Sequence, residues 1–145
     1  MSYTIYDSTT GKITSVVTAS LPQVANLNIA NTTYIDGAFD GTKYYINNGV
    51  PTLLPVNPST SLMKYKFDWT DKTWNLDSTA TTLAVRSRRN MFLSATVDKV
   101  NPVWFASLTQ EQQTELQTYR TALLNVPQQS GFPTTITWPT KPSWL

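Results

Sequence analysis

Two pairs of aspartates are the residues whose spacing comes closest to supporting chemistry. Asp36 and Asp40 bracket one short polar stretch, and Asp68 and Asp71 bracket another. Paired carboxylates serve as acid and base in glycoside hydrolysis, or they bind a divalent cation. Asp-Gly and Asp-x-x-Asp sequences in turn-rich stretches, however, are ordinarily turn formers. We therefore predict turns at both places and no catalytic residue.

Two residue types are missing from the chain, and their absence excludes several classes of catalytic and metal site. The sequence has no cysteine and no histidine. This excludes disulfides, thiol catalysis, triads with a histidine base, and zinc, iron–sulfur or haem sites held by these residues. The glycine-rich phosphate loop, the G-x-S-x-G elbow and the H-E-x-x-H motif are absent too. We expect a non-enzymatic protein without a functional metal or cofactor.

Arg86, Arg88 and Arg89 form the single basic cluster of the sequence. The cluster is small, it lacks flanking lysines, and the net charge of the chain is only +2, so we expect no nucleic-acid partner. Arginines in such a group ordinarily pair with an aspartate of the same chain or with a carboxylate of another protein. We take Arg86 and Arg89 as candidate partner-binding residues.

The last twenty residues combine prolines with large apolar side chains. Frequent prolines disfavour a helix and favour an extended chain. Tryptophan is among the residues most enriched in binding hot spots. Two alternatives stay open for this segment: it packs back on its own domain, or it docks on another protein. The candidate partner-binding residues here are Phe132, Ile136, Trp138, Trp144 and Leu145.

The length and composition of the chain limit the kinds of fold that can position these residues. The chain has 145 residues, enough for one domain or two small ones. Charged residues make up 14% and hydrophobic residues 40%, which argues against a disordered chain and against a coiled coil. No apolar run approaches the roughly 20 residues of a membrane-spanning helix, so we expect no membrane partner.

The composition of the chain changes near Pro58. Four of the five glycines and none of the five tryptophans precede this residue. Residues 51–58 contain three prolines and are predicted to be an extended linker. We predict two domains, an antiparallel β module over residues 1–58 and a second domain over residues 59–145.

The N-terminal domain is predicted to consist of short strands joined by turns. Asp-Gly and Asn-Gly sequences supply the positive φ angles that tight hairpins need. Residues 20–32 are left open, because Leu21, Val24 and Leu27 fit one face of a helix whereas the asparagines oppose it. The predicted strands are residues 3–6, 13–18, 33–35, 43–46 and 50–54.

The second domain is predicted to open with a β-hairpin, residues 64–67 paired with residues 73–76. Alternating aromatic and polar residues indicate these strands, and Tyr65, Phe67 and Trp74 are placed to form cross-strand pairs. We expect Trp69, Trp74, Trp104 and Phe105 to form core of this domain, with an interface role for some of them.

Two helices are predicted after the hairpin. The first covers residues 79–97, with Asp77, Ser78 or Thr79 as its cap. The second begins with a capping box formed by Thr109 and Gln112, and Pro127 ends it. Asn101-Pro102 separates the two, so they are expected to form an antiparallel hairpin. The predicted apolar stripe of the first helix is Ala80, Leu83 or Ala84, Ser87, Met91 and Ala95. Together with the strands this defines an α+β fold that ends in an extended, Pro- and Trp-rich arm.

A series of residue blocks in the second domain is shared, in order and spacing, with a known family. The blocks are Arg86-x-x-Arg89-Asn90, Leu93, Asp98, Trp104, Leu108-Thr109-x-Glu111-Gln112, Tyr119-Arg120-x-Ala122-Leu123, Val126-Pro127-Gln128-Gln129-x-Gly131-Phe132-Pro133 and Ile136-x-Trp138-Pro139-x-Lys141-Pro142. Over residues 81–145 they resemble the C-terminal segment of bacteriophage tail assembly chaperones and tail-fibre assembly proteins. One departure is the loop of residues 99–103 between Asp98 and Trp104, because the family often has Asp-Trp adjacent.

The N-terminal domain carries a second resemblance. Its blocks Tyr34-Ile35-Asp36-Gly37, Asp40 and Tyr44-Tyr45-x-x-x-Gly49-x-Pro51 are similar to a module of small phage tail-fibre-associated proteins.

The two resemblances imply a non-enzymatic function. They imply binding of a phage tail or tail-fibre protein through the C-terminal part, as an assembly chaperone or a tail component, alone or in a homo- or hetero-oligomer. The implied location is the host cytoplasm during assembly, the virion tail, or both. The alternative is a carbohydrate-binding module on a fibre tip, which requires two or three coplanar aromatic rings in a shallow exposed groove.

Overall fold

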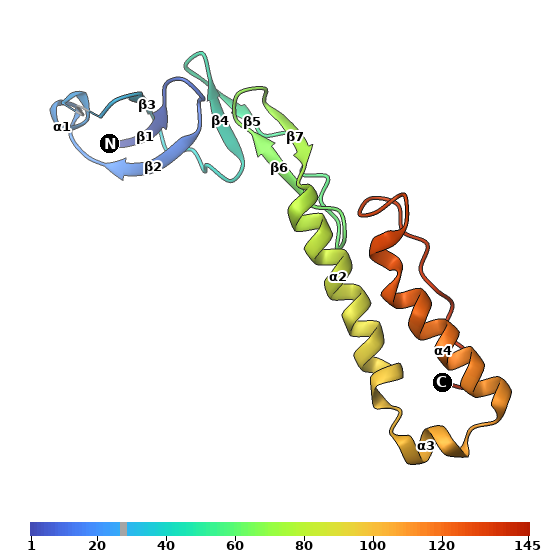
Figure 1. The fold of residues 1–145 in the computed structure, drawn as a ribbon. Helices are drawn as coiled ribbons and strands as arrows, with labels where there is room; N and C mark the ends of the chain where they lie inside the picture. The colour runs from blue at the N-terminus through green and yellow to red at the C-terminus, as the bar shows by residue number, and fades with distance from the viewer. Residues whose placement is uncertain (27–28) are drawn as a thin grey trace. The chain divides into compact units, whose positions relative to one another are not determined.

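The structure is a computed structural model that describes residues 1–26 and 29–145 (Figure 1). Small antiparallel sheets and helices make up the chain, so the predicted α+β class is confirmed. Its internal contacts divide it into two compact units. The first unit is Met1–Asn57 with Phe67–Asn75, and the second is Pro58–Lys66 with Leu76–Leu145.

The first unit is built on a three-stranded antiparallel sheet. Its strands β1 (Ser2–Asp7), β2 (Ile13–Thr18) and β3 (Thr32–Asp36) lie in the order β2-β1-β3. Because β1 is central, its side chains at Tyr3 and Ile5 are buried. They pack with Val24 of the short helix α1 (Leu21–Ala25). Of the predicted helical face, Val24 is buried and Leu21 is exposed, while Leu27 lies outside the described residues.

The hairpin of β4 (Tyr44–Asn47) and β5 (Val50–Leu53) confirms the predicted Asn-Gly turn. Asn48 and Gly49 adopt φ angles of 49° and 79°, the conformation of a tight hairpin turn. Pro51 pairs with Ile46 inside β5, so the linker predicted for residues 51–58 begins too early. Proline is tolerated there because a strand at a sheet edge need not donate every N–H.

A third hairpin, β6 (Tyr65–Asp68) with β7 (Thr73–Leu76), carries aromatic side chains. Phe67 contacts Trp74 edge to face, with ring centroids 5.2 Å apart, which confirms the predicted cross-strand pair. Phe67 also contacts Trp69 and Tyr45, at 4.9 and 6.4 Å. Trp69 and Trp74 therefore belong to the first unit, and their predicted place in the core of the second domain is wrong. The reason is tertiary, because the tip of this hairpin packs with β4.

The second unit contains two long helices. Helix α2 (Ser78–Ala95) is capped by Asp77, whose carboxylate accepts a hydrogen bond from the N–H of Ala80 at 2.8 Å. Helix α4 (Gln110–Leu124) begins with the predicted capping box of Thr109 and Gln112. A 3₁₀ turn (Val97–Lys99) follows α2, and a second one (Val126–Gln128) containing Pro127 follows α4. Within residues 1–26 and 29–145, no helix is long and apolar enough to cross a bilayer.

An additional helix lies between the two long ones. Helix α3 (Pro102–Ser107) has Asn101 as its cap and Pro102 in its first turn. The side chain of Asn101 accepts a hydrogen bond from the N–H of Trp104 at 2.9 Å. The sequence predicts only a break between two helices at this dipeptide, although a capping residue followed by proline also starts helices. Trp104 is 39% exposed on α3, so its predicted burial is wrong, whereas Phe105 does pack against the helical core.

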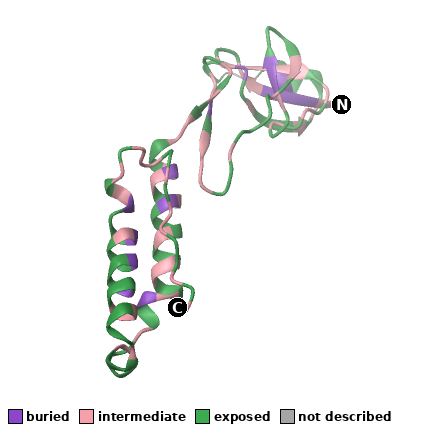
Figure 2. Cartoon of the chain, turned by 90° about the vertical axis from the view of Figure 1, so that its right-hand side faces the viewer, coloured by how far each residue is buried: buried purple, intermediate pink, exposed green. Residues whose placement is uncertain are grey.

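The face that α2 turns to the core differs from the predicted stripe. Thr81 and Val85 are completely buried, whereas Leu83 and Met91 are 63% and 53% exposed. Figure 2 shows buried positions of α4 on the side turned to α2. Apolar residues occur on two faces of α2, so periodicity alone did not identify the buried one. Hydrogen bonding selects it, because the hydroxyl of Thr81 accepts from the N–H of Lys64 at 3.0 Å in the segment before the hairpin.

Candidate functional site

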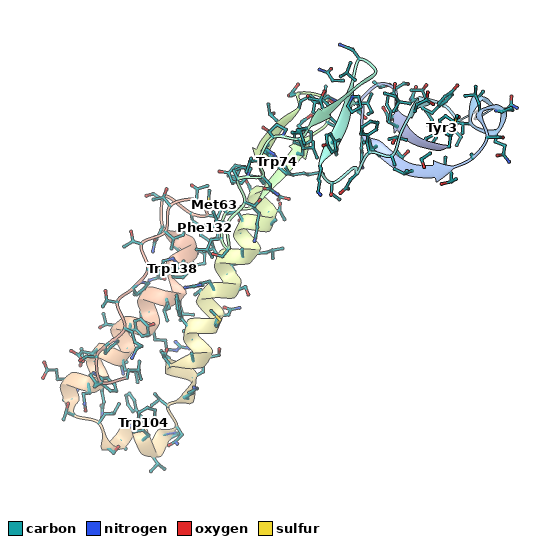
Figure 3. The ribbon with its side chains drawn as sticks, turned by 180° about the vertical axis from the view of Figure 1, so that it is seen from behind. Tyr3, Met63, Trp74, Trp104, Phe132 and Trp138 are labelled. Carbon is teal, nitrogen blue, oxygen red and sulfur yellow. The ribbon has the colours of Figure 1, made fainter. Side chains whose placement is uncertain are left out.

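The C-terminal arm, defined as residues 132–145, packs against the helices of its own unit. The core between the helices is formed by Val97, Leu116, Tyr119 and Leu123, and both Trp144 and Leu145 pack against it. Further along the helices, Trp138 lies against Phe92 of α2 in an edge-to-face contact of 5.3 Å (Figure 3). Of the two alternatives that the sequence left open, the packing on its own domain is the arrangement observed.

Polar contacts hold the arm at its middle and near its C-terminal end. The indole N–H of Trp144 donates to a carboxylate oxygen of Glu115 on α4 at 2.5 Å. Before the arm, the side-chain amide of Gln129 exchanges two hydrogen bonds with the backbone of Thr137, at 2.8 and 2.9 Å. Gly131 closes the turn between them, since a Cβ there would lie 2.5 Å from the carbonyl oxygen of Thr135. The arm is thus an ordered segment although it has no regular secondary structure.

The predicted partner-binding residues of the arm share one property, which is partial burial. Each residue is covered in part and keeps some solvent-accessible surface. This state suits a surface that is both packed and available to a second protein. The half-buried residues are Phe132, Ile136, Trp138, Trp144 and Leu145.

The arginine cluster lies on α2, beside the contact between α2 and the arm. The guanidinium of Arg88 lies over the ring of Phe92 at 5.2 Å, and Trp138 meets the same ring. Arg89 is half-buried and donates two hydrogen bonds to the side chain of Asn90, at 3.0 and 2.7 Å. Arg86 is exposed. Phe92 therefore connects the basic cluster to the arm, a role that the sequence analysis missed because it assigned the buried face of α2 incorrectly.

Two shallow grooves flank α4. One of about 450 Å³ lies between α4 and the arm, with Glu115 and Tyr119 on one side and Pro139, Lys141 and Pro142 on the other. The second, of about 470 Å³, is lined by the 3₁₀ turn after α2, by α3 and by α4, including Val97, Phe105 and Leu116. Their walls are largely apolar with charged side chains at the edges, which suits contact with another polypeptide.

The aspartate pairs form turns. A carboxylate oxygen of Asp40 accepts from the N–H and hydroxyl of Thr42 at 2.8 and 2.7 Å. Asp68 accepts from the N–H groups of Thr70 and Asp71 at 2.8 and 3.1 Å. Within residues 1–26 and 29–145, no cluster of three or more acidic, cysteine or histidine side chains is arranged to hold a metal ion. The predicted turn-forming role of Asp40 and Asp68 is confirmed.

Asp7 also forms a turn, at the start of the polar stretch between β1 and β2, where turn-forming residues follow one another. Its carboxylate accepts from the N–H groups of Thr9 and Thr10 at 2.9 and 2.7 Å. Hydrogen bonds from Thr10 hold the pKa of Asp7 below its ordinary value, and those from Thr42 do the same for the pKa of Asp40. Both carboxylates are stabilised in the charged form by hydrogen bonds from the side chain and backbone of a nearby threonine.

The ring geometry does not support the carbohydrate-binding alternative. Among the described residues, the aromatic pairs in contact have interplanar angles between 49° and 88°. A sugar-stacking surface requires rings that lie in one plane, whereas these rings meet edge to face or tilted.

The segment that contains most of α2, all of α3 and α4, and most of the arm can be compared with known families. Residues 82–143 match the model of the phage tail assembly chaperone protein family. The match covers less than half of the chain and lies in the second unit. It confirms the resemblance drawn from the residue blocks, and we call residues 82–143 the chaperone-family segment. No curated protein and no solved structure matches the chain.

The chaperone-family segment is thus similar in sequence to phage tail assembly chaperones. It consists of the elements that the preceding paragraphs place together, namely two packed helices, a short connecting helix and a docked arm.

Proposed function

We propose that the protein holds a tail or tail-fibre protein during phage assembly, in the host cytoplasm, through its second unit. The observation that carries this proposal is the coincidence of the chaperone-family segment with a packed helical hairpin whose arm keeps accessible apolar surface. Assembly chaperones work by covering surfaces of their clients, so they need a binding face and no reaction centre.

We propose that the binding face includes Arg86 and Arg89 of α2 together with the arm. Partner binding to a segment that is already ordered costs less conformational entropy than binding to a free tail. Tryptophan and arginine at the centre of an interface commonly carry much of its affinity. The arm residues that we propose as contacts are Phe132, Ile136, Trp138, Trp144 and Leu145.

The same proposal includes the organisation and fate of the protein. We propose residues 1–58 as the N-terminal domain and residues 59–145 as the partner-binding domain, although the contacts of β6 and β7 place residues 67–75 with the first unit. We further propose that the protein forms an oligomer with its client and stays in the finished tail. Mass spectrometry of purified particles tests the last point directly, since a purely transient chaperone is absent from them.

The experiment that tests the function is co-purification of the tagged full-length chain with each tail protein encoded by the same phage. Thr140→Glu places a charge on an exposed part of the arm without removing a packed side chain. We expect this variant to retain its melting temperature and to lose about tenfold or more of the co-purified client.

Trp104→Ala is the matched control, because Trp104 is an exposed tryptophan on α3, the short helix that connects α2 and α4 (Figure 3). We expect it to co-purify its client like the unmodified protein. If no tail protein co-purifies with the unmodified chain, the proposed function is wrong. If the Thr140→Glu protein binds the client normally, the arm is not part of the binding face.

A further inference from the structure

Helix α2 presents an apolar face on the side opposite its buried residues. Leu83 and Met91 are 63% and 53% exposed, and Ser87 lies midway between them in the sequence. At 100° per residue, residues four apart form one row along a helix; in this row Leu83 lies opposite Thr81 and Val85, and Met91 lies at about 120° from Val85. We call the row of Leu83, Ser87 and Met91 the outer face of α2.

Arginines border the outer face on both sides. The same helical geometry places Arg86 on one side of the row and Arg88 on the other, and both are exposed. The helix has three arginines and no acidic residue. Among the described residues no carboxylate pairs with Arg86, and Arg88 rests on the ring of Phe92. The outer face therefore combines apolar side chains with positive charges that this chain does not neutralise.

We propose that the outer face of α2 docks an acidic amphipathic helix of the client protein, which rests on the proposed function that the client is a phage tail protein. The apolar row would pack against the apolar stripe of the client helix, and the two arginines would face carboxylates on either side of that stripe. The small side chain of Ser87 between the two larger ones allows the close approach of about 8–10 Å that packed helices adopt. Eighteen residues give α2 a length of about 27 Å, enough for several turns of contact.

The positive charge of the outer face favours an acidic helix over two other occupants, a second copy of this chain and a nucleic acid. A second copy of α2 would bring arginines against arginines, and like charges across an interface are destabilising. A nucleic acid is a poor match as well, because the centre of the face is apolar and proteins that bind DNA through phosphates commonly make about 6–10 such contacts. An acidic client helix satisfies both the apolar row and its basic borders.

Site-specific photo-crosslinking in cells that produce the phage tests the inference. We place p-benzoylphenylalanine at position 83 or 91 of the full-length chain and at Val103 or Leu124 as controls, which are exposed on α3 and α4. We expect crosslinks to a tail protein from positions 83 and 91, about fivefold or more above those from the controls. The crosslinked client peptides should carry net negative charge.

Charge reversal is the second part of the experiment. Arg86→Glu combined with Arg88→Glu should reduce the crosslinks from position 83 about tenfold or more. Arg120→Glu, at an exposed arginine of α4, should change them by less than about twofold. Circular dichroism on each purified variant verifies that it is folded.

Several results would overturn the inference. They are equal crosslinking from the outer face and the controls, crosslinks to a second copy or to nucleic acid, a client peptide without excess acidic residues, and insensitivity to the charge reversal. If the client still co-purifies in such a case, only the docking face is wrong and the proposed function stands. If no client co-purifies with the unmodified chain, the proposed function itself fails.

Discussion

At the residue scale, Gly11 is a position where the backbone geometry does not tolerate a larger residue. It adopts a φ of 69°, and its carbonyl oxygen connects the first hairpin to β4, since it accepts a hydrogen bond from the N–H of Ile46 at 2.9 Å. A Cβ at this position would lie 2.0 Å from the carbonyl oxygen of Ile46. Only glycine combines a left-handed conformation with so close an approach of two backbones.

We expect Gly11→Ala to lower the free energy of unfolding by about 2 kcal/mol or more, because backbone strain and a steric clash add together. Gly49→Ala is the matched control, since Gly49 has a φ of 79° but nothing within 4 Å of the added Cβ. It should cost only about 1 kcal/mol, the conformational part alone. Urea unfolding of both variants measures the difference, and equal losses would show that the contact with Ile46 carries no cost.

The lowered pKa values of Asp7 and Asp40 make stability depend on pH in one direction. A carboxyl group whose pKa is lower in the folded state binds protons more readily when unfolded, so its contribution is present above the unfolded pKa and is lost as pH falls through the folded pKa. We expect the melting temperature to fall between about pH 5 and pH 3. The variant with Asp7→Asn and Asp40→Asn should show a smaller fall, and an unchanged pH profile would argue against these two groups.

At the element scale, the contact of the arm with α2 rests on a few side chains. Trp138 meets Phe92, and the guanidinium of Arg88 contacts the same ring. The aromatic pair therefore couples a segment without secondary structure to the middle of the helical hairpin. The same contact makes the arm part of the unit's packing as well as of the proposed binding face.

We expect Trp138→Ala to cost about 1–3 kcal/mol, less than a fully buried tryptophan, because Trp138 is half-buried. A double-mutant cycle with Phe92→Ala should give a coupling of about 0.5–1.5 kcal/mol, typical of an edge-to-face pair. Chemical denaturation of the four proteins in the cycle measures it. Pairing Trp104→Ala with Phe92→Ala is the control and should be additive, whereas a zero coupling for Trp138 would mean that the arm does not rest on Phe92.

At the scale of the whole molecule, the two compact units are expected to respond separately to loss of the arm. A truncation after Gln129 uncovers the core of Leu116, Tyr119 and Leu123, against which Trp144 and Leu145 pack. We expect faster hydrogen exchange throughout α2 and α4 and unchanged exchange in β1 to β3. Hydrogen–deuterium exchange with mass spectrometry resolves both regions in one sample.

The comparison for this experiment is a shorter truncation after Lys141, which removes Trp144 and Leu145 but leaves Trp138 in place. It should raise exchange near Leu116 and Tyr119 more than near Phe92, because the two ends of the arm contact different parts of the hairpin. Native-like exchange in the helices of both truncated proteins would mean that the arm contributes nothing to the stability of its unit.

Local signals in the sequence were sufficient for the caps and turns. The capping box at Thr109, the cap at Asp77 and the hairpin turn at Asn48-Gly49 depend on hydrogen bonds and φ angles within four residues, so the residue types alone specify them. Helix α3 is also specified locally, because Asn101 caps it and Pro102 lies in its first turn. The same two residues also fit a break between helices, which is what the sequence predicts there. The chaperone-family segment was recognised for a different reason, because its residue blocks match those of the family in order and spacing.

Tertiary structure decided the rest. Helix α2 has apolar residues on two faces, and only the bonding of Thr81 to Lys64 and the packing of Phe92 turned Val85 inward and left Leu83 exposed. Trp69 and Trp74 joined the first unit through Tyr45, more than twenty residues earlier in the chain, and the arm closed on helices that precede it. Which face an element buries depends on contacts between residues distant in sequence. Local sequence patterns do not encode the energies of these contacts. The sequence by itself thus determined the caps and turns that begin and end many of these elements, while the faces that the elements bury or leave exposed came from long-range packing.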